Sequence, residues 1–193
     1  MSLLSMEHSS VAYRLDFALY TLLCAANATA LMSFHPAGSA WELLLWVVGG
    51  GVLWSLLEYL LHRFVLHGVA PFSNWHGLHH QRPAALIASP IALSLSLFLL
   101  LATLPAWWLT GGWHALALTL GLMSGYLVYS VAHHATHHRT PVWISNNAWI
   151  TQCRIRHAMH HSAHHLKARG AMSKPCHFGV SNSLWDEVFG TRE

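Results

Sequence analysis

Four long apolar stretches constrain what this 193-residue chain can fold into. They lie at about residues 15–34, 41–61, 86–109 and 113–132, and a helix of about 20 residues is long enough to cross the hydrocarbon core of a bilayer. Charged residues make up only 9% of the sequence, whereas a soluble domain has roughly 25%. The sequence therefore predicts an all-α integral membrane protein with four transmembrane helices, rather than a large soluble domain with buried helices.

The basic residues predict how these helices cross the membrane. The chain has 10 Lys and Arg against 7 acidic residues, an excess too small and too scattered to indicate nucleic-acid binding. With four spans, all the basic residues fall on the side that holds both termini, and the opposite loops, residues 35–40 and 110–112, contain none. Because Lys and Arg accumulate in cytoplasmic loops, we expect both termini in the cytoplasm. The membrane would be the inner membrane of a bacterial cell or the endoplasmic reticulum of a eukaryotic one.

Histidines form the second dominant pattern, with 18 in the chain. Most of them fall in clusters at residues 62–80, 133–138 and 157–165, and the predicted topology places all these clusters on the side of the termini. Only His35 and His114 fall near the opposite side. We therefore expect one domain over residues 1–193, in which a histidine-rich helical cap lies at the cytoplasmic ends of the four spans.

The spacing of these histidines suits metal binding, because residues three or four apart share one face of a helix. Two clusters have the pattern HxxHH, and the last span ends in two interleaved pairs whose members are four residues apart: His76, His79 and His80; His157, His160 and His161; His133 and His137; His134 and His138. His62 and His67 are five apart and would converge only if the helix ends or distorts between them. Neutral imidazole binds first-row transition metals, and ten or more imidazoles exceed the needs of one ion. Two neighbouring metals are the most economical interpretation.

Carboxylates are nearly absent from this part of the sequence. No Asp or Glu occurs between Arg63 and Lys174, whereas soluble di-iron bundles use Glu and Glu-x-x-His ligands. We therefore expect an almost purely imidazole ligand shell. Glu58, four residues before His62, and Asp186, near the C-terminus, are candidates for hydrogen bonds that orient the ligands.

The motifs EYLLHRFVLH, HGLHH, GYLVYSVAHHATHH, RHAMHH and HFGVSNSLWDEVFGT occur in the order found in the fatty acid hydroxylase superfamily. That superfamily includes fatty acid/sphingolipid 2-hydroxylases, sterol desaturases and carotene hydroxylases. The chain resembles it over roughly residues 58–191, most of all the 2-hydroxylase branch. The resemblance implies a cytoplasmic dimetal centre with ten ligands: His62, His67, His76, His79, His80, His133, His137, His157, His160 and His161. His134 and His138 have the same spacing as His133 and His137, so the choice between these pairs stays open.

The resemblance further implies a membrane di-iron oxygenase that hydroxylates a lipid C–H bond, most simply on a fatty acyl chain. It would use two iron ions, which zinc can replace in a purified protein, together with O2 and external electrons. The sequence has no haem, flavin, nicotinamide or iron–sulfur motif, so the electrons would come from a separate carrier such as a cytochrome b5-like protein or a ferredoxin. The alternatives are a carotenoid hydroxylase, a sterol-type desaturase and, outside the enzymes, a histidine-rich metal transporter or metal-binding membrane protein. The segment LKARGAMSKPC is longer than expected of a 2-hydroxylase, which leaves the substrate open.

Overall fold

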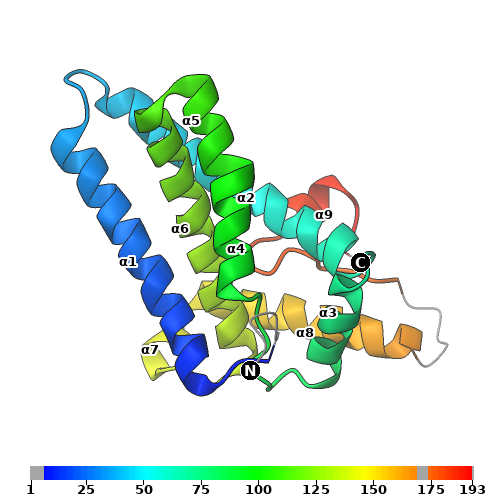
Figure 1. Cartoon of the computed structure of the whole chain (residues 1–193). Helices are drawn as coiled ribbons and strands as arrows, with labels where there is room; N and C mark the ends of the chain where they lie inside the picture. Colours follow the sequence, from blue (N-terminus) through cyan, green and yellow to red (C-terminus); the bar gives the residue numbers. More distant parts are fainter. Residues whose placement is uncertain (1–6, 169–173, 193) are drawn as a thin grey trace. The chain divides into compact units, whose positions relative to one another are not determined.

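The computed structural model of the chain describes residues 7–168 and 174–192 (Figure 1). Its elements, in chain order, are α1 (Ser10–Phe34), α2 (Ala40–Leu60), the π-helical η1 (Leu61–Leu66), α3 (Phe72–Gln81), α4 (Ile91–Phe98), the π-helical η2 (Leu99–Thr103), α5 (Leu104–Thr110), α6 (Gly112–His137), α7 (Val142–Ser145), α8 (Ala148–Ala168) and α9 (Leu184–Val188). One isolated β-bridge joins Glu7 and Ile87. The prediction of an all-α protein is confirmed. Residues 169–173, in the long segment noted above, lie outside the described part.

Four helical stretches are long and apolar enough to cross a membrane: Ser10–Phe34, Ala40–Leu66, Ile91–Thr110 and Gly112–His137. Large apolar side chains on them are exposed, as lipid-facing residues would be; Leu45 is 69% exposed and Trp108 is 85% exposed. The chain is therefore an integral membrane protein with several spans. The third stretch begins five residues later than predicted, because Pro90 precedes its first turn. The fourth ends at His137, five residues beyond the predicted end of the span at residue 132.

The chain divides into two compact units. The first runs to Trp54 and resumes over Leu86–Leu127, and the second comprises Ser55–Ala85 and the chain from Val128 onward. All three histidine clusters belong to the second unit. Its small core includes Ala132 of α6, Cys153 of α8 and Val180 of the C-terminal segment, so these three parts of the sequence pack together there.

In the first unit, glycines allow α2 and α6 to pack backbone against backbone. Gly50 lies against Gly121, and an added Cβ at Gly121 would lie 2.9 Å from the Gly50 Cα and would overlap the Val47 carbonyl oxygen. Such close approach is typical of small residues in membrane helix pairs. Gly49, one residue from Gly50, has open space where its Cβ would be.

Gly121→Ala is expected to lower the free energy of unfolding by about 1–3 kcal/mol, the usual cost of overpacking a tight contact. Gly49→Ala adds the same methyl group to a helix without a clash, so it should be neutral or stabilise by up to about 1 kcal/mol. Thermal unfolding in detergent measures both. Equal stability of the two variants would contradict this packing.

Candidate metal centre

The π-helical turn η1 brings together two histidines that a regular α-helix would separate. A π-helix pairs residues five apart, and π-helical turns often occur at functional sites. The rings of His62 and His67 lie with their centroids 5.1 Å apart across this turn. This is the helix distortion that the five-residue spacing required.

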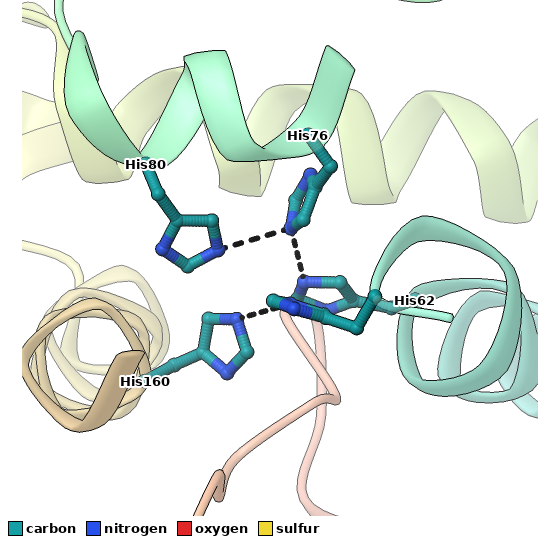
Figure 2. Close-up of side chains that lie close together, drawn as sticks. His62, His76, His80 and His160 are labelled. Carbon is teal, nitrogen blue, oxygen red and sulfur yellow. Dashed lines mark hydrogen bonds between the residues drawn. The ribbon is translucent and has the colours of Figure 1, made fainter. Parts of the chain in front are cut away.

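The first group of histidines gathers around η1 (Figure 2). Its ring nitrogens come from η1 and the residue that caps it, and from α3 and α8, and all lie within 4.8 Å of one another: His62, His67, His76, His80 and His160. The Nε2 atoms of His62 and His76 are 3.0 Å apart, and those of His67 and His160 are also 3.0 Å apart. Figure 2 shows His62, His76, His80 and His160 pointing toward one another, with His76 and His80 on one helix, α3, and the other two on separate helices.

The second group is formed by α3, α6 and α8. Four of its members have ring nitrogens within 4.8 Å of one another: His79, His133, His137 and His157. The Nε2 atoms of His157 and His137 are 2.8 Å apart, and those of His133 and His79 are 3.1 Å apart. His161 adjoins this group, with its Nε2 atom 3.1 Å from that of His157.

Helical periodicity explains how the two HxxHH motifs are divided. The i, i+4 pair of each motif points into one group and the middle histidine points into the other. In α3 the pair joins the first group and His79 joins the second; in α8 the pair joins the second group and His160 joins the first. Each of these helices therefore serves both groups. The groups also touch, because the rings of His80 and His161 stack with centroids 4.1 Å apart.

The remaining histidines of these segments lie around the two groups. His134 and His138 stack on each other at 4.7 Å, half-buried, and belong to neither group, so it is His133 and His137 that point inward. His164 stacks on His80 at 4.2 Å, and His165 is exposed.

Hydrogen bonds to the backbone set the tautomer of two ring systems in the first group. His62 donates from Nδ1 to the carbonyl oxygen of Phe178 at 2.5 Å, and His160 donates from Nδ1 to that of Cys176 at 2.7 Å. In a neutral imidazole the proton on Nδ1 leaves the lone pair on Nε2, and here both Nε2 atoms face the interior of the group. Lone pairs that converge in this way suit a cation, so the donor set fits transition-metal ions such as iron or zinc.

Burial keeps these imidazoles neutral. It is the main cause that lowers the pKa of His76 and His157 well below the ordinary value, and neighbouring imidazoles add to the shift. Burial likewise lowers the pKa of His79 and of His160 to about 4. At neutral pH these rings therefore offer lone pairs rather than positive charges.

The lowered pKa values predict how the metal-free protein responds to acid. An unfolded histidine has a pKa of about 6.5, so below that pH the unfolded chain takes up protons that the folded chain does not. The free energy of unfolding should fall as pH drops from about 6.5 toward about 4, by roughly 1.4 kcal/mol per pH unit for each such histidine. Thermal unfolding in the presence of a chelator should show a steep fall between pH 6.5 and 5.5 and little change between pH 8.5 and 7.5. A flat profile over the acidic interval would contradict the burial of these rings.

Two buried carboxylates hold the segment that orients the histidines. Glu58 accepts hydrogen bonds from the backbone N–H groups of Val180 and Ser181, both at 2.7 Å, and from the Ser181 hydroxyl. Asp186 accepts from the N–H groups of Phe178 and Gly179 at 2.8 and 2.9 Å. The sequence suggested that Glu58 and Asp186 would bond to histidines. They act one step further out, because their oxygens bind the backbone of the loop whose carbonyls accept from the rings.

Sequence patterns gave no signal for some of these contacts. Nothing in the sequence marks the carbonyls of Cys176 and Phe178 as hydrogen-bond acceptors. The stacking of Tyr129 on His133, with ring centroids 5.7 Å apart, was not predicted either, although Tyr129 lies one helical turn before that histidine.

Comparison with known proteins identifies the family of the chain. The model of the family described as fatty acid hydroxylase matches residues 46–191. The chain belongs to the fatty acid hydroxylase family. The resemblance seen in the sequence motifs is thereby confirmed, and the family match extends about twelve residues further toward the N-terminus than those motifs.

Several similar proteins are named as hydroxylases of fatty acids or fatty acyl groups. Human fatty acid 2-hydroxylase is 30% identical over 74% of this chain and 38% of its own length. Dihydroceramide fatty acyl 2-hydroxylase FAH2 of Arabidopsis thaliana is 32% identical over 75% of this chain and 60% of its own length. Ceramide very long chain fatty acid hydroxylase scs7 of Schizosaccharomyces pombe is 29% identical over 72% of this chain and 39% of its own length. The chain thus spans between about two fifths and three fifths of the length of these relatives.

A solved structure shares the fold. The full-length scs7p structure, in which only the hydroxylase domain is visible, aligns with 97% of this chain and 68% of that chain. The TM-score is 0.74 at 20% sequence identity, so the likeness concerns the fold alone.

Proposed function

We propose that this chain is a membrane di-iron oxygenase that hydroxylates a C–H bond of a lipid, on its fatty acyl chain. The observation that carries the proposal is the pair of adjoining histidine groups with inward-facing nitrogens, in a member of the fatty acid hydroxylase family. The names of the relatives point to acyl hydroxylation rather than to the oxidation of carotenoids or sterols.

The proposed ligands are the histidines of the two groups together with His161: His62, His67, His76, His80 and His160 for one ion, and His79, His133, His137, His157 and His161 for the other. Iron bound there would supply the activation of O2 needed to attack an unactivated C–H bond, and zinc could take the same positions in a purified protein. The protein's own residues hold and orient this centre. His62 and His160 keep their protons on Nδ1, and Glu58 and Asp186 hold the loop that receives them.

Two partners complete the proposed reaction. The lipid would reach the centre from the bilayer, in which the four apolar helices lie. The electrons would come from a separate carrier, such as a cytochrome b5-like protein or a ferredoxin. The distribution of Lys and Arg favours a cytoplasmic position for the histidine groups and for both termini, where such a carrier could reach them.

Lipid mass spectrometry of a host that expresses the chain tests this function. The host should accumulate an acyl lipid heavier by one oxygen atom, and His160→Ala should abolish it because it removes a nitrogen from the first group. His165→Ala is the matched control: it changes an exposed histidine of the same helix and should leave the product unchanged. A lipid with a new double bond would indicate a desaturase instead. Metal transport into proteoliposomes without any oxidised lipid would favour the transporter.

A further inference from the structure

We propose that a cavity beside the first histidine group binds the carboxylate end of a long-chain acid, and that Arg63 is the residue that recognises it. This inference rests on the proposed function and specifies its substrate class. The substrate would be a free fatty acid rather than an acyl group already joined to an amine. Arg63 would then determine which lipid is accepted and which carbon lies nearest the centre.

The cavity lies within the second unit and has a volume of about 590 Å³. Its lining includes Arg63, Phe64, His67, His164, Phe178 and Thr191. Ligand-binding pockets commonly measure about 300–1,000 Å³, and this open pocket, which combines phenylalanine rings with charged and polar side chains, falls within that range. Because His67 is a member of the first histidine group, the cavity reaches the candidate metal centre itself.

Arg63 is held in place by polar and aromatic neighbours in the described part of the chain. Its Nη1 donates to the Tyr59 hydroxyl at 2.6 Å, and that hydroxyl lies 2.9 Å from Thr191 Oγ1. The guanidinium also lies over the rings of Phe64 and Phe178, at 5.0 and 5.8 Å from their centroids. Among the residues that the structure describes, no carboxylate pairs with Arg63.

A guanidinium in this state is suited to a carboxylate. It has five N–H donors in a planar fork that matches a carboxylate in a bidentate fashion, and here one described acceptor, the Tyr59 hydroxyl, uses part of that capacity. Packing over the aromatic rings accounts for the position of Arg63, but these rings do not neutralise the positive charge of the guanidinium at the cavity wall. An anionic ligand would do so, whereas a neutral amide or alcohol would not.

The position of Phe178 relates the bound carboxylate to the reactive carbon. The Phe178 ring lies near both Arg63 and the first histidine group, with its centroid 5.8 Å from the guanidinium carbon and 5.6 and 5.3 Å from the ring centroids of His67 and His160. A chain whose carboxylate pairs with Arg63 would therefore pass its first carbons, rather than its far end, beside the first histidine group. Oxidation close to the acid end follows from this geometry.

Equilibrium binding to the zinc-loaded full chain in nanodiscs tests the proposal without turnover. The ligands are palmitate and its neutral analogue palmitamide. Charge-assisted hydrogen bonds contribute about 1.5–3 kcal/mol, so palmitate should bind roughly 10- to 100-fold more tightly. Arg63→Gln should lose this preference by weakening palmitate alone, and Arg63→Lys should keep part of it because a point charge remains. Arg139→Gln, which removes an exposed arginine that does not line the cavity, should change neither affinity.

Equal binding of palmitate and palmitamide by the unsubstituted chain would overturn the proposal, and this comparison requires no variant to fold. Retention of the preference by Arg63→Gln with normal zinc content would overturn it too. Failure of the proposed function would look different, because it would appear as the absence of an oxidised lipid in the host. If amide-linked lipids are hydroxylated and palmitate is not preferred, the oxygenase assignment stands and the role of Arg63 is wrong.

Discussion

Asp186→Ala is expected to destabilise the protein by about 3–5 kcal/mol, since three buried donors lose their acceptor at about 1–3 kcal/mol each, and to weaken metal binding by about tenfold, the low end of the effect of partners that bond the ligands directly. Asp186 is fully buried, and its carboxylate accepts hydrogen bonds from two backbone N–H groups and from the Thr191 hydroxyl. Removing it leaves these buried donors without acceptors, and unsatisfied buried groups are costly. The two N–H groups belong to Phe178 and Gly179. Because the carbonyl of Phe178 accepts the hydrogen bond that orients His62, loss of Asp186 also frees this carbonyl to move.

Chemical denaturation of the metal-free protein and titration with zinc measure the two effects of Asp186→Ala. The stability and zinc affinity of Asp186→Asn should lie between those of Asp186→Ala and those of the unsubstituted chain, because its amide oxygen can still accept a hydrogen bond. Glu187→Ala is the matched control: the neighbouring carboxylate is exposed and pairs with Arg192 at 2.7 Å on the surface, so its loss should change stability by less than about 0.5 kcal/mol. Equal stability and equal zinc affinity of Asp186→Ala and Glu187→Ala would contradict the role of Asp186 in holding this loop.

The second large effect concerns neighbouring positions of α8. His157→Ala and His160→Ala are each expected to remove one of two bound metals and to leave the other, because these residues point into different groups. The Nε2 atom of His157 faces that of His137, and the Nε2 atom of His160 faces that of His67. Metal analysis after dialysis against a weak chelator gives the number retained per chain. His165→Ala should retain both, since its side chain is exposed.

The same experiment distinguishes two separate sites from one shared site. With two sites, the double variant His157→Ala/His160→Ala should retain no metal under conditions in which each single variant retains one. If a single substitution removes as much metal as the double, the histidines form one cooperative site. If neither single substitution has any effect, these rings are not ligands.

Much of this fold could be predicted because hydropathy and helical periodicity act over short distances. Four apolar stretches predicted four helices, and the HxxHH spacing predicted which rings share a face. The division of each motif between two groups could not be predicted, because it depends on where α3 and α8 pack. The start of the third helix was misplaced for a local reason. The segment 86–90 is mostly apolar and was counted as part of the span, but the helix begins only after Pro90.

The supporting contacts of the histidines were the least predictable part. Glu58 was expected near His62 because the two are four residues apart on one helix, but its carboxylate bonds to residues 180 and 181, far away in the sequence. The choice between His133 and His134 depended on the rotation of α6 about its axis, which two interleaved pairs of equal spacing do not reveal. The five-residue spacing required the helix to end or distort between His62 and His67, and that it does so by a π-helical turn was visible only in three dimensions.

Anomalous diffraction from crystals of the metal-loaded protein tests the central claim most directly. We predict two neighbouring anomalous peaks, one surrounded by the nitrogens of His62, His67, His76, His80 and His160 and the other by those of His79, His133, His137, His157 and His161. A single peak, or peaks located away from these nitrogens, would contradict the assignment of the two histidine groups as a dimetal centre.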